Sequence, residues 1–205
     1  MTKKQAQFMA KKNLVNLVFS TSKFEGTRAT LSQTRTIIEG LGVSGVTTDD
    51  IITIVNLKRG WQFVITNDAP YVLAISNQIN VLVAKNDSLE PGHVRAGNVM
   101  LDNTEYVPPV PEIARVAPAI RGILEAENKT FTERLLDLLL TMMCQQFYWD
   151  GNKRTAFLTI NYLAIDAGVG LFNINESQLE AFNNLLATFY ETGNGDDFNQ
   201  RKFRD

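Results

Sequence analysis

The sequence has a single cysteine, Cys144, and a single histidine, His93, among its 205 residues. One cysteine excludes an intrachain disulfide, which fits a reducing compartment, and we expect a cytoplasmic protein. With one histidine, any catalytic or metal-binding role of an imidazole is limited to His93. His93 lies in the turn-like stretch Glu-Pro-Gly-His-Val, so a site elsewhere in the chain can use it only if folding brings it there.

Excess positive charge and long apolar runs are also missing. The formal net charge is −2, and no run of five basic residues occurs, which argues against a protein that binds nucleic acid by neutralising phosphates. The most apolar segment, 135–144, is interrupted by Asp137 and is too short to span a bilayer. Residues 1–12 are polar and carry lysines, so we expect no signal peptide and no membrane partner.

Apolar residues recur at helical spacing along most of the chain, in a composition that is 44% apolar and 20% charged. Such a composition and length fit one globular domain. Helices are predicted over 5–24, 30–39, 49–65, 71–84, 112–127, 130–146, 152–167 and 175–192, with Thr130 or Thr132 capping the sixth and Asn175 or Ser177 the last. Segments 98–101 and 105–107 flank Asp-Asn-Thr and predict a β-hairpin over about 97–108. The fold class is therefore all-α with one hairpin.

A sharp break separates the two most apolar predicted helices. It contains Asp150, Gly151, Asn152, Lys153 and Arg154, directly before a helix start. A helix N-terminus exposes N–H groups and a partial positive charge, so a glycine turn followed by two cations describes a phosphate cradle. A plain helix–helix loop with two solvated cations explains the same residues, and the loop alone leaves both interpretations open.

An acidic residue near the N-terminus has an unusual position. Glu25 precedes Gly26, which fits the C-terminal cap of the first helix, where the helix dipole disfavours a negative charge. Glu25 is either an ordinary exposed glutamate or a carboxylate held there for a cationic partner elsewhere in the chain.

The stretch from Asp150 to Ala156, placed between two apolar helices, resembles the signature of the Fic family, His-x-Phe-x-Asp/Glu-Gly-Asn-Gly/Lys-Arg. Segments 91–95 and 106–109, with the hairpin between them, resemble the family's flap and its flanks. Thr21-x-x-x-Glu25-Gly26 resembles the Ser/Thr-x-x-x-Glu-Gly/Asn motif of an inhibitory helix. Together these features cover roughly residues 10–190.

This resemblance implies the Fic fold, in which a central pair of buried helices surrounds a phosphate-binding loop. It further implies a single compact domain, made of an N-terminal helix with the inhibitory motif at 1–30 and a core at 31–205. The core would carry the flap hairpin and the C-terminal helix.

The resemblance also implies roles for individual residues. Asp150 stands where the family holds Mg²⁺, and Gly151, Asn152 and Lys153 stand in the anion-binding nest. Arg154 stands where an arginine contacts a phosphate of ATP or another nucleotide. Flap residues Met100, Leu101 and Tyr106 would clamp a target peptide by strand addition. Thr21, Glu25 and Gly26 form the inhibitory motif.

Two positions depart from the family pattern. Gln146 stands where the family has its catalytic histidine, and a glutamine amide cannot accept a proton near neutral pH. General-base assistance is worth a factor of about 10² to 10⁴. Phe157 stands where many relatives carry a second arginine, the usual partner of the inhibitory glutamate. Glu25 then meets Arg154 or Lys153 instead, or the motif is a relic.

Three functional interpretations follow from these residues. The first is a Fic-fold protein that binds Mg-nucleotide and is related to enzymes that transfer AMP from ATP to protein hydroxyls, with activity impaired or altered by Gln146. The second is a phosphotransferase that resembles the Doc kinases, which are among the relatives that have a lysine after the asparagine. The third is a non-enzymatic module that holds a protein partner on the flap edge. The sequence leaves open whether the chain forms a homodimer.

Overall fold

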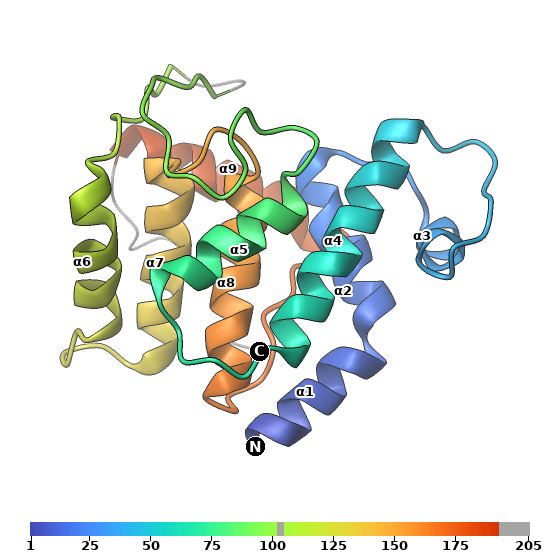
Figure 1. The fold of residues 1–205 in the computed structure, drawn as a ribbon, viewed down its shortest axis with the longest axis horizontal. Coiled ribbons are helices and arrows are strands. Elements are labelled where there is room, and N and C mark those ends of the chain that lie inside the picture. The colour runs from blue at the N-terminus through green and yellow to red at the C-terminus, as the bar shows by residue number, and fades with distance from the viewer. Residues whose placement is uncertain (102–104, 193–205) are drawn as a thin grey trace.

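The computed structural model describes residues 1–101 and 105–192, and it confirms the all-α class. The elements in chain order are α1 (Lys3–Lys12), α2 (Leu14–Ser22), the 3₁₀ turn η1 (Lys23–Glu25), α3 (Leu31–Ile38), α4 (Thr48–Thr66), α5 (Leu73–Val83), α6 (Ile113–Leu124), α7 (Phe131–Gln145), α8 (Asn152–Asp166) and α9 (Glu176–Thr192). Figure 1 shows α8 behind α5, with α6 and α7 on one side and α1 to α4 on the other.

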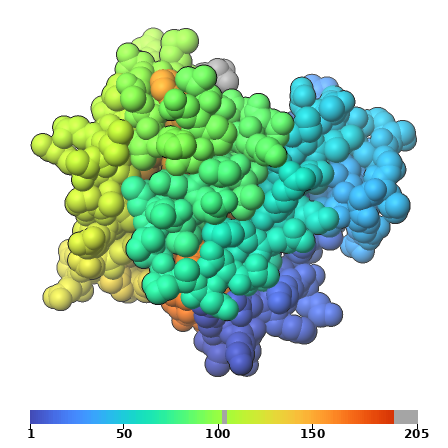
Figure 2. All heavy atoms as spheres, viewed as in Figure 1, coloured from blue at the N-terminus to red at the C-terminus, as the bar shows by residue number. Residues whose placement is uncertain are grey.

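Helix α8 is the centre of the molecule. It packs against α4, α5 and α7, and thirteen of its fifteen residues are buried. On the face shown in the space-filling view, only small areas in the orange of this part of the chain are visible between the covering elements (Figure 2). Asn161, a buried polar residue of α8, is satisfied internally, since it donates to the Phe157 carbonyl and accepts from the Phe172 N–H.

The helix before the loop contains the most apolar segment of the sequence, yet it is less buried than α8. Six of the fifteen residues of α7 are buried, all of them apolar. The opposite face of α7 carries exposed or half-exposed polar residues such as Thr132 and Asp137. Hydropathy alone ranks 135–144 above α8, but burial depends on how many helices surround each one.

The N-terminal helix predicted over 5–24 is divided at Asn13. The Asn13 side chain donates to the Met9 carbonyl at 2.9 Å, and its backbone N–H also bonds back to that turn, so local bonding by the amide interrupts the helix. The second piece, α2, is fixed to α4 by Thr21, whose hydroxyl accepts from the Trp61 Nε1 at 3.1 Å. Gly26 closes this region at φ +70°, as predicted.

Helix boundaries otherwise follow the predicted signals closely. Thr130, rather than Thr132, caps α7 and forms a capping box with Glu133. The residue that precedes α9 is Asn175, and Gly168 follows α8 at φ +67°. None of the helices in the described ranges is long and apolar enough to cross a bilayer.

The β-hairpin predicted over 97–108 is not confirmed. Segments 98–101 and 105–107 contain no strand, and the expected turn at 102–104 lies outside the described residues. The flanking chain is anchored instead by side-chain contacts, described below.

Candidate functional site

The loop between α7 and α8 is shaped by contacts with α5. Gly151 adopts φ +70°, and a Cβ added there would lie 2.7 Å from the Cβ of Ala84, so both conformation and space require glycine. Asn80 on α5 donates to the Asp150 carbonyl at 2.9 Å and to the Thr155 hydroxyl at 3.0 Å. The sequence gives no sign of this fully buried asparagine's role, because it lies within an apolar helical pattern.

A second set of bonds closes the loop on itself. The Asn152 side chain accepts from the Tyr148 N–H at 2.9 Å and donates to the Tyr148 carbonyl at 2.8 Å. Asn152 therefore holds the loop rather than presenting its amide freely. No side chain caps the N-terminus of α8 at Gly151. The first-turn N–H groups are thus left for an anion in the adjoining space.

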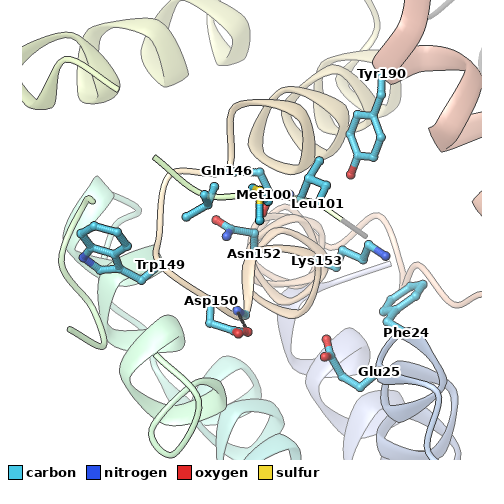
Figure 3. Close-up of a pocket in the computed structure, with 12 residues that line it drawn as sticks. Phe24, Glu25, Met100, Leu101, Gln146, Trp149, Asp150, Asn152, Lys153 and Tyr190 are labelled. Atoms are coloured by element: carbon cyan, nitrogen blue, oxygen red, sulfur yellow. Dashed lines mark hydrogen bonds between the residues drawn. The ribbon is translucent and has the colours of Figure 1, made fainter. Parts of the chain in front are cut away.

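A cavity of about 400 Å³ lies in front of this helix start. Its lining combines the loop, the 3₁₀ turn η1, the flap segment and α9. Figure 3 shows Glu25 and Asp150 on one side of the cavity and Gln146, Met100 and Leu101 on the other. The lining residues are Phe24, Glu25, Val99, Met100, Leu101, Gln146, Trp149, Asp150, Gly151, Asn152, Lys153 and Tyr190.

Arg154 is held by three carboxylates beneath the cavity. Its guanidinium, 1% exposed, lies 2.9 Å from a carboxylate oxygen each of Glu25, Asp87 and Asp150. It also donates to the Val83 carbonyl at 2.6 Å. The contact with Glu25 is an ion pair by distance, but the Arg154 Nε–H direction does not meet hydrogen-bond geometry there. Glu25 is therefore the most weakly oriented of the three carboxylates.

Burial raises the pKa of Glu25 above its ordinary value, although attraction by Arg154 acts in the opposite direction. The side chain remains 30% exposed, because it faces the cavity. Three carboxylates and the two cations Lys153 and Arg154 leave one net negative charge at the site. In this state the loop region already contains an anionic side chain, the carboxylate of Glu25.

Asp150 has the properties needed for a magnesium ligand. One of its oxygens accepts from the Gly151 N–H and from Arg154, while the side chain is 45% exposed at the cavity. No cluster of three or more His, Cys, Asp or Glu side chains suited to a metal occurs within 1–101 and 105–192. Mg²⁺ commonly binds through one or two carboxylates plus phosphates and water, so Asp150 fits that mode rather than an all-protein cage.

Gln146 ends α7 in a strained conformation. It has φ +47° and ψ +63°, which non-glycine residues adopt at a cost of about 1–3 kcal/mol. Its side-chain amide donates to the Met143 carbonyl at 2.5 Å, and the residue is only 6% exposed. The amide thus bonds to its own helix, and it carries no group that titrates near neutral pH.

The described flap residues lie at the mouth of the cavity. Met100 is 91% exposed, and Met100 and Leu101 line the cavity. Tyr106 stacks on Tyr190 of α9, with ring centroids 5.6 Å apart, and accepts a hydrogen bond from Cys144. Tyr106 therefore fixes the returning arm of the flap against the body of the protein.

Comparison with known proteins gives matches at the level of structure. No family model matches the sequence, and no curated protein matches it. Fic-1 from C. elegans (residues 134–508) aligns with a TM-score of 0.70 at 19% identity, over 87% of this chain and 56% of that one. A Fic domain-containing signaling protein from Bacteroides thetaiotaomicron aligns at 0.73 and 16% identity, over 86% and 71%.

A Fic family protein from Desulfovibrio desulfuricans aligns at 0.59 and 19% identity, over 89% of this chain and 54% of that one. The chain has the Fic fold. It spans little more than half the length of two of these three proteins.

In this Fic fold, the position expected for a second arginine belongs to the core. Phe157 is 1% exposed and packs edge-on against Phe24 at 5.2 Å, next to Glu25 in the chain. Phe24 also contacts Phe182 of α9. Aromatic packing therefore holds the segment that carries Glu25, and Arg154 supplies the only arginine partner that Glu25 has among the described residues.

The single histidine is not part of the site. His93 is exposed, and it is absent from the lining of the cavity. The fold therefore gives Gln146 no replacement imidazole from His93.

Sequence reasoning missed several residues of this Fic-fold site. Asp87 and Tyr190 belong to no motif in the sequence. Asp87 follows α5 in the chain and Tyr190 lies on α9, and only folding brings them to the cavity region. Arg95 is visible in the sequence only as part of the flap flank, yet it is fully buried at the base of the flap.

Proposed function

We propose that the chain binds a Mg-nucleotide in the cavity in front of α8, and that AMP transfer to protein hydroxyls is slow because residue 146 is glutamine. The observation that carries the proposal is the α8 N-terminus. It has a glycine at positive φ, no side-chain cap and a cation-bearing first turn, and it opens into a cavity of about 400 Å³.

Charge explains why magnesium and displacement of Glu25 go together. With Glu25 in place the site carries one net negative charge and repels a polyphosphate. When Glu25 is displaced and Mg²⁺ is added at Asp150, the site gains an ion of charge +2 beside the cations Lys153 and Arg154. The site then becomes net positive and suits a nucleotide triphosphate.

Each residue has a distinct role in this proposal. The first-turn N–H groups of α8 and Lys153 bind phosphate oxygens, and Asp150 would hold Mg²⁺, which neutralises developing charge when bound. Arg154 contacts phosphate once Glu25 withdraws. Gln146 can donate a hydrogen bond to a hydroxyl or phosphate but cannot take the proton of the attacking hydroxyl. We therefore expect the site to bind and position its substrates but to turn them over slowly.

Isothermal calorimetry and thermal unfolding with Mg-ATP test the proposal. Ligand at about a hundred times Kd should add about 2.7 kcal/mol to the free energy of unfolding. Lys153→Met removes a phosphate contact of about 1.5–3 kcal/mol, so Kd should rise about tenfold or more. Lys4→Met, the same change on exposed α1, is the matched control and should leave Kd unchanged. Absence of any shift in both wild type and Glu25→Gln would refute nucleotide binding.

A second candidate function is protein docking without catalysis, and the exposure of the flap favours it. Met100, which lines the cavity, is 91% exposed, and Val107 on the returning arm is 62% exposed, so the flap places apolar side chains in solvent. Capture of a protein that is lost in Met100→Asp but kept in Lys153→Met would support a docking module. Capture that requires Lys153 and Mg-ATP would support the transferase instead.

A further inference from the structure

Arg95 is a buried cation at the base of the flap. It is 0% exposed, and within the described part of the chain its guanidinium donates only to backbone carbonyls. The Nε donates to the Gln146 carbonyl at 2.5 Å, the Nη2 donates to the Pro109 carbonyl at 2.6 Å, and the Nη1 donates to the Gly97 carbonyl. Weaker contacts at 3.3 Å reach the carbonyls of Gln145 and Pro108.

These bonds join three segments that are distant in sequence. Gly97 begins the outgoing arm of the flap, and Pro108 and Pro109 end its returning arm. Gln145 and Gln146 form the C-terminal end of α7. The Arg95 backbone N–H adds a bond to the Phe147 carbonyl at 2.9 Å. One side chain therefore fixes both ends of the flap to the residue that stands at the family's catalytic position.

The cost of burying a charge means that packing alone does not explain an arginine at position 95. A buried charge costs several kcal/mol unless it is compensated, and no carboxylate is among its hydrogen-bond partners in the described residues. Burial lowers the pKa of Arg95 for this reason. The carbonyls at the C-terminus of α7 carry the negative end of the helix dipole, and they supply the compensation.

These bonds help to hold the strained backbone of Gln146 in place. A residue at φ +47° persists only where its surroundings over-determine the conformation, and the Arg95 bond to its carbonyl is one such constraint. We propose that Arg95 is a positioning residue that sets the flap in register with residue 146, so that a segment held by the flap meets the reacting centre. The reaction itself rests on the proposed function, but the positioning does not.

Arg95→Met and Arg95→Lys test the proposal by amide hydrogen exchange. Three amides report on the joint: those of residue 95, Gln146 and Tyr148, which donate to Phe147, Met142 and Asn152 respectively. The amides of Asn67 and Ala167, at the ends of α4 and α8, report on the rest of the fold.

In Arg95→Met the three joint amides should exchange about tenfold faster or more, which corresponds to about 1.4 kcal/mol, while the two reporter amides change little. Arg95→Lys should not restore protection, because a single ammonium cannot bridge carbonyls in three segments. Arg134→Met is the matched control, since Arg134 also donates to a carbonyl, that of Leu124, away from the cavity.

Function is measured in the same variants. Mg-ATP affinity should stay within about twofold of wild type in Arg95→Met, because the phosphate-facing groups are untouched. If the Gln146→His variant labels protein, adding Arg95→Met should lower its kcat and leave its KM for the nucleotide unchanged. Unchanged exchange at the joint, or equal acceleration at all five amides, would overturn the positioning role. If wild type binds no nucleotide, the proposed function fails and the exchange data alone decide on Arg95.

Discussion

Replacing Glu25 with glutamine should strengthen Mg-ATP binding without weakening the fold. The change removes one of three carboxylates around Arg154 and keeps the size of the side chain. Arg154 retains Asp87 and Asp150, so it is not left as an unpaired buried charge. Glu25 is the carboxylate whose contact with Arg154 lacks hydrogen-bond geometry, and it faces the cavity that the nucleotide would enter.

The magnitude follows from what the ligand must displace. An exposed ion pair contributes about 0.2–1 kcal/mol, and a hydrogen bond to a charged group about 1.5–3 kcal/mol. Glu25 is 30% exposed and its contact with Arg154 lacks hydrogen-bond geometry, so we take the upper end of the ion-pair range, about 1 kcal/mol, as the cost of displacing it. Removing that cost should lower Kd by about 5-fold.

The pH dependence of stability provides an independent check on the same residue. Because burial raises the pKa of Glu25 above its ordinary value of 4.5, the folded chain binds this proton more tightly than the unfolded chain. The stabilisation from protonated Glu25 is complete below about pH 4.5 and is lost as pH rises through the folded pKa. Glu25→Gln should therefore unfold at an equal or higher temperature at pH 7 and lose this part of the pH dependence.

Calorimetry at fixed Mg²⁺ and about 0.15 M salt measures the affinity, and thermal unfolding from pH 4 to pH 8 measures the stability. Asp50→Asn provides a control, because Asp50 is an acid outside the cavity that accepts a bond from the Arg28 N–H. An unchanged Kd in Glu25→Gln would refute the idea that this carboxylate competes with phosphate. A clearly lower unfolding temperature at pH 7 would refute the pKa direction.

Three other substitutions test separate parts of the site. Gln146→His should raise label transfer from ATP to protein by about 10²-fold or more, measured with labelled nucleotide, if only the base is missing. Gly151→Ala should abolish the Mg-ATP thermal shift, because its Cβ meets Ala84 at 2.7 Å and its φ is +70°. Thr21→Val leaves the buried Trp61 N–H unpaired and should lower the free energy of unfolding in denaturant titrations by about 1–3 kcal/mol.

Local signals predicted most of the helices, because caps, glycines and apolar spacing act within a few residues. Thr130, one of the two candidate caps, begins α7, and Gly26 closes the segment after α2 as predicted. The failures have the same physical basis. At Asn13 a local side-chain bond divides a helix that apolar spacing continues, and the strand signal around 98–107 is not matched by any strand in the described flanks.

The site was partly visible from sequence, since Asp150 to Arg154 occupy one short loop. The position of Glu25 next to Gly26 and the resemblance of Gln146 to the Fic histidine position also marked these two residues. It could not assign Asp87, Asn80 or Tyr190, because nothing local distinguishes a charged or polar residue that meets the loop from one that faces solvent.

The sequence by itself determined most of the helices and the glycine turn before α8, since each depends on residue type and near neighbours. The expectation of a missing base at Gln146 came from the resemblance to the Fic family. Only the tertiary structure decided which helix is central, that Glu25 lies on Arg154, and that Arg95 joins the flap to residue 146. Those outcomes depend on long-range packing, which buries a charge only where carbonyls or carboxylates from distant segments converge to compensate it.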